Sequence, residues 1–235
     1  FLLSSLSNTI SHERTTMAAF FFSFATLIII TQSLFARGNA LSAKEPRVAL
    51  ITGANKGIGF EIAKKFAADP SFTTILACRT NGEKAAKELG GSGKDVHSVY
   101  LELTDDESIA GCRDYVEKNF GSLDVLVNNA AICFNDPTLY GKVPHTPFHQ
   151  QASITIETNY FGTKKLTEAL LPLMMLKTKS VSSPRIINIA SSAGRLGIFR
   201  GAQDKIDMFT HNSLTIQDLD SHMREFVQAV ESGEH

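Results

Sequence analysis

Short apolar runs alternate with helical patterns along the chain from Arg47 onward. Short apolar runs between glycine, proline or polar clusters are typical of buried strands, whereas apolar positions three or four apart are typical of helices. This alternation predicts an α/β fold built on a Rossmann-type, doubly wound parallel sheet of about five strands. The predicted strands cover residues 48–52, 73–78, 96–103, 123–127 and 185–190.

Predicted helices follow these strands, and local signals mark several of their ends. They cover residues 61–68, 82–89, 104–120, 154–176 and 214–230. Thr104 and Glu107 stand three positions apart, as the two members of a capping box do at a helix start. Gly121 is expected to end the same helix. In the last helix, helical spacing is kept by Ile216, Leu219, Met223, Phe226, Val227 and Val230.

The first 45 residues differ from the rest of the chain and are expected to form a leader. The chain does not open with methionine, and its first methionine is Met17. The uncharged apolar block 18–30, followed by small residues at 38–40, is typical of a signal peptide or an organelle pre-sequence. The uncharged stretch 15–36 is also long enough for a membrane anchor. We therefore expect a start at Met17 and a secretory or organellar destination; if these residues are mistranslated upstream sequence, the protein would be cytoplasmic.

Composition and charge exclude several other classes of protein. Lys+Arg total 23 against Asp+Glu 24, so the net charge of -1 lacks the bulk attraction that nucleic-acid binding usually needs. The cysteines Cys78, Cys112 and Cys133 are too few and too widely spread for a disulfide framework or a paired metal motif. We expect residues 46–235 to be a globular domain without metal, with membrane contact only through the leader.

A glycine-rich turn, Thr-Gly-Ala-Asn-Lys-Gly-Ile-Gly at residues 52–59, joins the first predicted strand to the first helix. Glycines at such spacing allow a tight turn, close approach of the backbone to a pyrophosphate, and close packing of helix on strand. The helix N-terminus supplies free N–H groups to the phosphates. The alternative is an ordinary glycine-rich turn. The candidate cofactor residues are Gly53, Asn55, Lys56, Gly57, Ile58 and Gly59.

The end of the second strand indicates which dinucleotide would bind. An acidic residue there would accept the ribose 2′-hydroxyl of NAD, but the sequence has Cys78-Arg79-Thr80. Arg79 can face a 2′-phosphate, and Lys56 in the glycine turn supplies a second cation. Two cations and no carboxylate favour NADP(H), unless both are solvated surface charges.

These segments resemble the short-chain dehydrogenase/reductase family, and more closely its monomeric NADPH-dependent carbonyl reductases. The resemblance extends from about Arg47 to the C-terminus, with the matching segments in the family's order and at its spacings. The matching segments are TGANKGIG at 52–59, LDVLVNNA at 123–130, TNYFGT at 158–163 and RIINIASS at 185–192.

The resemblance implies further cofactor contacts. Asn129 would lie beside the cofactor ribose at the end of the fourth strand, although turn chemistry would also explain an asparagine there. Glu102 and Leu103 would lie near the adenine. The family usually has aspartate where this chain has the longer Glu102.

The resemblance also implies two catalytic residues. Asn159 falls on the family's catalytic asparagine, which helps to hold a water in a proton relay; the alternative is a satisfied interior polar residue. Ser191 falls on the family's catalytic serine, which hydrogen-bonds the substrate carbonyl. An ordinary serine turn, with Ser192 as its neighbour, is the alternative for that position.

The family's proton donor, a tyrosine with a lysine four residues later, has no counterpart after Ser191. The tyrosines are Tyr100, Tyr115, Tyr140 and Tyr160. Tyr160 has Lys164 at the required spacing, but it precedes the serine strand and should diverge from Asn159 on the helix. We therefore predict that the Tyr160–Lys164 pair is not the active site.

Residues 194–235 resemble the insertion that such reductases carry before the tyrosine, so we expect a fragment whose last strands are missing. The expected function is that of an NADPH-dependent carbonyl reductase, which transfers hydride to a ketone or aldehyde and acts as a monomer. Without the tyrosine and lysine, the fragment should be nearly inactive. The alternatives are a noncatalytic NADP(H)-binding or interaction module and an unfolded product of a faulty gene model.

Overall fold

The computed structural model describes residues 46–90, 93, 95–134, 146–176, 183–191, 194–199 and 201–233. The predicted leader lies outside the described residues. The described chain divides into two compact units. Residues 46–131 and 161–189 form the sheet unit, and residues 132–160 and 190–233 form the helical unit.

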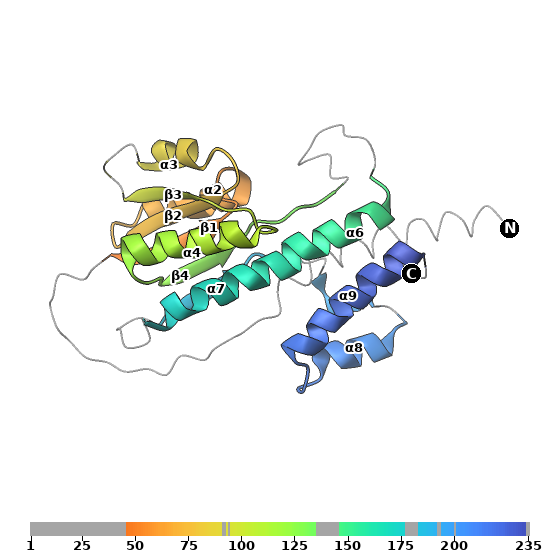
Figure 1. Ribbon diagram of the computed structural model, residues 1–235. Coiled ribbons are helices and arrows are strands. Elements are labelled where there is room, and N and C mark those ends of the chain that lie inside the picture. The colour runs from red at the N-terminus through yellow and green to blue at the C-terminus, as the bar shows by residue number, and fades with distance from the viewer. Residues whose placement is uncertain are drawn as a thin grey trace. The chain divides into compact units, whose positions relative to one another are not determined.

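The sheet unit contains five parallel strands among its described residues (Figure 1). These are β1 (Arg47–Thr52), β2 (Phe72–Cys78), β3 (Val96–Tyr100), β4 (Val125–Asn128) and β5 (Arg185–Asn188). Their order is β3-β2-β1-β4-β5, and every neighbouring pair is parallel. The predicted α/β fold with a parallel sheet is thus confirmed. The strand order reverses between β1 and β4, and ligands of such sheets bind at the carboxyl ends of the strands beside this point.

Helices cover both faces of the sheet because the buried strands are apolar on both sides. The helices are α2 (Gly57–Ala67), α3 (Gly82–Gly90), α4 (Asp106–Phe120) and α7 (Thr163–Met175). Along β1, Val48 and Leu50 pack into one core cluster with residues of α4 and α7. Ala49 and Ile51 pack into a second cluster with residues of α2 and α3. The period of two along β1 therefore places one helix pair on each face.

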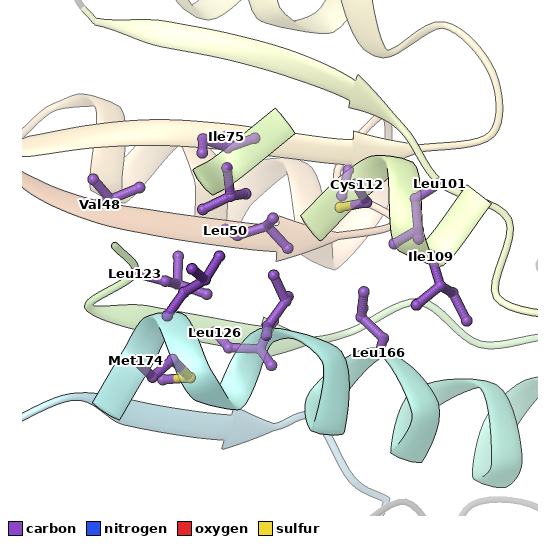
Figure 2. Close-up of a cluster of buried hydrophobic side chains, with 14 of the residues drawn as sticks. Val48, Leu50, Ile75, Leu101, Ile109, Cys112, Leu123, Leu126, Leu166 and Met174 are labelled. Atoms are coloured by element: carbon purple, nitrogen blue, oxygen red, sulfur yellow. The ribbon is translucent and has the colours of Figure 1, made fainter. Parts of the chain in front are cut away.

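The first cluster is the larger apolar core, and Figure 2 shows side chains of α4 and α7 converging on the strands. Leu50, Leu126 and Leu166 are fully buried there. Cys112 belongs to the same cluster, and burial raises the pKa of its thiol to about 12. This cysteine is therefore a neutral, apolar core residue at physiological pH.

The helical unit contains α6 (Phe148–Ile156), the short helix Leu196–Ile198, α8 (Gln203–Thr210) and α9 (Ile216–Ser232). The rings of Phe148 and Phe226 join α6 to α9, with 6.2 Å between their centroids. The predicted helix 214–230 is confirmed as α9, and a capping box between Thr215 and Asp218 fixes its start. Among the described helices, none combines the length and apolarity needed to cross a membrane.

Two local predictions are corrected. Thr104 does not cap α4; the Asp105 side chain accepts the Glu107 N–H at 2.9 Å instead, while the Thr104 hydroxyl donates to Glu102. The predicted strand 96–103 ends at Tyr100, so Glu102 lies in the connection to α4.

The predicted helix 154–176 is also different in the structure. It begins earlier, as α6, and a π-helical turn over Glu157–Gly162 separates α6 from α7. The apolar spacing of the sequence did not reveal this turn. Such turns inside helices are frequent at functional sites.

Replacing Leu166 by alanine should lower the free energy of unfolding of the sheet unit by about 2–5 kcal/mol, because the cavity left between α7 and the strands cannot collapse fully. Leu176, which follows α7 and is 64% exposed, provides the matched control. L176A should change the free energy by less than about 0.5 kcal/mol. Urea unfolding measures both, and equal effects would contradict the packing described for α7.

Candidate functional site

The hydroxyl of Thr52 joins the carboxyl ends of β1 and β4. Its oxygen accepts the N–H groups of Asn129 and Ala130, both at 2.9 Å, and its hydroxyl donates to the Val127 carbonyl at 3.3 Å. A hydroxyl has one donor and two acceptor positions, so all three are used here. The Asn129 amide also donates to the Thr52 carbonyl at 2.9 Å. These hydrogen bonds therefore fix the position of the residue at which the glycine turn begins.

The turn itself needs glycine for two different reasons. Gly53 and Gly57 have φ angles of 63° and 58°, in the left-handed region that side chains disfavour. At Gly59 the reason is space: a Cβ would lie 2.4 Å from Asn129 Nδ2 and 2.6 Å from the Gly53 carbonyl oxygen. The start of α2 thus packs directly on the junction between β1 and β4.

The N-terminus of α2 carries a local electrostatic conflict. Lys56 is its N-cap residue, no side chain caps the helix, and its first turn has no acidic residue. A side chain caps each of α4 and α9, whereas α6, α7 and α8 also lack one, so what sets α2 apart is the lysine at its N-cap position. A lysine at the positive end of a helix dipole is unfavourable, whereas a bound anion there is favourable. A Cβ at Gly57 would meet nothing within 4 Å, so the turn leaves space for such an anion.

The end of β2 lies against the same turn. The backbone N–H groups of Ala54 and Asn55 face the sulfur of Cys78 and act to lower the pKa of its thiol, and Cys78 is buried. Burial raises the pKa of the Cys78 thiol more strongly than these two N–H groups lower it. The thiol is therefore neutral at physiological pH and adds no negative charge beneath the turn. Arg79 follows directly, and its side chain is 59% exposed.

Arg79 and Glu102, both predicted from sequence as cofactor residues, form an ion pair. Arg79 Nη1 lies 3.0 Å from Glu102 Oε2. The two residues come from neighbouring strand ends, since the Leu101 N–H donates to the Cys78 carbonyl at 3.2 Å. Leu103, predicted beside the adenine, buries its side chain in the first core cluster.

Asn159 lies in the π-helical turn and is buried. Its Oδ1 accepts the Ile132 N–H at 2.8 Å, and its Nδ2 donates to the Ile132 carbonyl at 2.9 Å. Both ends of the amide are thus bound to the backbone that follows β4. Asn159 therefore fixes the start of the segment after β4. The low helix propensity of asparagine indicated that this residue has some role, but not which one.

Ser191 follows β5 by three residues and is half-buried. Its carbonyl accepts the Gly194 N–H at 3.0 Å. Ser192, its neighbour in the sequence motif, lies outside the described residues.

At the end of β5, the Asn128 amide donates to Asn188 Oδ1 at 2.9 Å and to Thr167 Oγ1 at 3.1 Å. This amide ties β4, β5 and α7 together just before the serine.

The structure brings the predicted cofactor residues together at the carboxyl ends of β1 to β4 in the sheet unit. The predicted catalytic residues Asn159 and Ser191 belong to the helical unit. Tyr160, which we predict is not catalytic, is buried and donates its hydroxyl to Asp220 Oδ1 at 2.8 Å. That contact between the π-helical turn and α9 supports a structural role for Tyr160.

Sequence reasoning assigned no role to Thr52 or Gly162. A polar residue that ends an apolar strand was the available signal for Thr52. Gly162 ends the π-helical turn, where a Cβ would lie 2.3 Å from the Leu103 carbonyl oxygen. The glycine within the segment 158–163 was the available signal for this close approach.

Gly162→Ala should destabilise the sheet unit by about 1–3 kcal/mol, because the added Cβ meets a backbone carbonyl that cannot rotate away. Gly111 in α4 is the matched control, since a Cβ there meets nothing within 4 Å. G111A should stabilise the unit by about 0.5–1 kcal/mol through helix propensity. Chemical denaturation measures both variants, and two stabilising effects would contradict the close approach of Gly162 to Leu103.

Known proteins are similar to this chain in sequence and in fold. Carbonyl reductase [NADPH] 1 of Sus scrofa is 35% identical over 193 residues, which cover 80% of this chain and 62% of that protein. The structure of menthone neomenthol reductase from Mentha piperita matches with a TM-score of 0.67 and 32% identity, covering 80% of this chain and 75% of that chain. A metagenomic short-chain oxidoreductase in complex with NADP matches with a TM-score of 0.53 and 29% identity, over 66% of each chain.

The chain spans somewhat less than two thirds of the length of the porcine relative. The family model described as short chain dehydrogenase matches residues 47–203. This match, together with the parallel sheet and the relatives above, shows that the chain belongs to the short-chain dehydrogenase family of oxidoreductases.

Proposed function

We propose that the protein is an NADPH-dependent carbonyl reductase, which reduces a ketone or an aldehyde. The observation that carries the proposal is the uncapped N-terminus of α2, with Lys56 at its N-cap position and Arg79 at the end of β2. Two cations and free backbone N–H groups suit the phosphates of NADPH. The names of the porcine reductase and of the NADP-containing oxidoreductase support the same cofactor.

The residues of the sheet unit fit this cofactor. The open space at Gly57 and the first N–H groups of α2 would receive the pyrophosphate. Arg79 and Lys56 would face the 2′-phosphate, and Asn129 would lie beside the ribose. NADPH supplies the hydride when it is bound. The protein's own part is to bind and orient the cofactor and the carbonyl.

Ser191 would donate a hydrogen bond to the substrate carbonyl, which polarises it toward hydride attack. Asn159 would act through its backbone, because Ile132 occupies both polar atoms of its side chain. A backbone carbonyl can accept two hydrogen bonds, so the Asn159 carbonyl could hold a water in addition to its helical bond.

The proton donor is the part that these 235 residues do not supply, because no tyrosine follows Ser191. Among the described tyrosines, Tyr160 donates its hydroxyl to Asp220. We therefore propose that the 235-residue polypeptide binds NADPH but reduces carbonyls at least about 10²–10⁴-fold more slowly than a reductase with a positioned acid. The same observation favours a second candidate function, a noncatalytic NADP(H)-binding or interaction module.

Titration of the 235-residue protein with NADPH, followed by cofactor fluorescence, should show saturable binding. Arg79→Ala should weaken NADPH binding by about tenfold to hundredfold, as loss of a charge-assisted hydrogen bond does. Arg113, a half-buried arginine on α4 that also forms an ion pair, is the matched control, and R113A should bind NADPH as the wild type does. Absence of NADPH binding by the wild-type protein would refute the reductase and the NADP(H)-binding module, and would leave only an interaction module.

Turnover distinguishes the two candidates. NADPH oxidation should be measured with a panel of ketones and aldehydes, for the 235-residue protein and for the product of the reading frame extended beyond the His235 codon. An extended frame that adds a tyrosine followed four residues later by lysine, and that turns over, would support the reductase. A frame without that pair would refute the reductase and leave the binding module.

A further inference from the structure

The ion pair between Arg79 and Glu102 changes what the end of β2 offers to a cofactor. Arg79 Nη1 and Glu102 Oε2 are 3.0 Å apart, and Glu102 is the partner of Arg79 within the described chain. A guanidinium that faces a carboxylate has part of its charge neutralised. The sequence alone showed two cations and no acid at this point, whereas the structure brings an acid there from the neighbouring strand end.

The carboxylate of Glu102 is held in place from the other side. The Thr104 hydroxyl donates to Glu102 Oε1 at 3.2 Å, and the Thr104 N–H does so at 3.5 Å. The Glu102 N–H donates to Ser108 Oγ at 2.8 Å, which fixes the backbone. The Glu102 side chain is 20% exposed against 59% for Arg79, so its charge is the less hydrated of the two. A partly buried, fixed charge acts more strongly on its neighbours than a solvated one.

We propose that Glu102 is a cofactor-specificity residue, whose carboxylate opposes the 2′-phosphate of NADPH and narrows the preference for NADPH over NADH. This inference rests on the proposed function, because it concerns the same cofactor site. A phosphate carries a charge of about −1.5 to −2 at neutral pH. Bound at Arg79, it would share that guanidinium with Glu102 and would be repelled by the carboxylate.

NADH has a 2′-hydroxyl in place of this phosphate, so Glu102 does not penalise it. In dinucleotide-binding folds, an acidic residue near the end of β2 accepts a hydrogen bond from that hydroxyl. The Glu102 carboxylate lies next to the end of β2, because it pairs with the guanidinium of Arg79, which directly follows that strand. The charge that opposes NADPH is therefore a candidate acceptor for NADH, and both effects act in the same direction on the preference.

Dissociation constants of NADPH and NADH, measured by cofactor fluorescence on the 235-residue protein, test the proposal. In Glu102→Gln, the ratio of the NADH constant to the NADPH constant should rise about three- to tenfold at low ionic strength, and less at high ionic strength. Glu88→Gln removes the same charge from an exposed position on α3 and should leave the ratio unchanged. Glu102→Asp keeps the charge on a shorter side chain, so its ratio should lie between the wild type and E102Q.

Thermal melting establishes that each variant is folded, and E102D serves if E102Q does not fold. An unchanged ratio of the NADH to the NADPH dissociation constant in a folded variant would overturn the proposal, because Glu102 would then have no effect on phosphate binding. A lower ratio would also overturn it, because Glu102 would then orient Arg79 toward the phosphate. Failure of the wild-type protein to bind either cofactor would instead refute the proposed function. Binding of NADPH with the same ratio in wild type and E102Q would refute this inference alone.

Discussion

The candidate site depends on one hydroxyl, that of Thr52, which fastens the end of β1 to the end of β4. It receives two backbone N–H groups from Asn129 and Ala130 and gives its own proton to Val127. These groups lie at the carboxyl ends of β1 and β4, where the strand order reverses. Without the hydroxyl, two part-buried N–H groups would lose their acceptor, at about 1–3 kcal/mol each. The glycine turn, and the helix terminus that it presents, are positioned by this junction.

The rest of the sheet unit places charge around that junction. Because β1, β2 and β3 are parallel neighbours, the N-terminus of α2 and the carboxyl ends of β2 and β3 lie at the same edge of the sheet. Lys56, Arg79 and Glu102 come to that edge from three different connections. Under the proposed function, the balance between two cations and one carboxylate, rather than any single residue, would determine which dinucleotide binds there.

Much of the fold could be predicted from the sequence, because short apolar runs and helical periods are local signals. The parallel sheet, α9 and the end of α4 at Gly121 all follow from such signals. The start of α4 was predicted at the wrong residue, because Thr104 is recruited by Glu102 and Asp105 takes its place. That choice depends on tertiary contacts, which spacing alone does not contain.

The candidate residues of the site could be chosen from the sequence, but the hydrogen bonds and ion pairs that they form could not. The motif order indicated Asn129, Asn159 and Ser191. The sequence could not show that both polar atoms of the Asn159 side chain hydrogen-bond the backbone of Ile132. The pairing of Arg79 with Glu102 joins residues 23 positions apart, and it depends on the order of β2 and β3 in the sheet. Long-range pairs of this kind become visible only once the strands are placed.

The NADPH affinity of Thr52→Val, compared with that of Thr52→Ser, tests the central claim most directly. Serine keeps the hydroxyl, so T52S should bind NADPH within about threefold of the wild type, whereas T52V should lose at least about tenfold through the unpaired N–H groups. A folded T52V protein that binds NADPH as tightly as the wild type would contradict the claim that this hydroxyl positions the cofactor site.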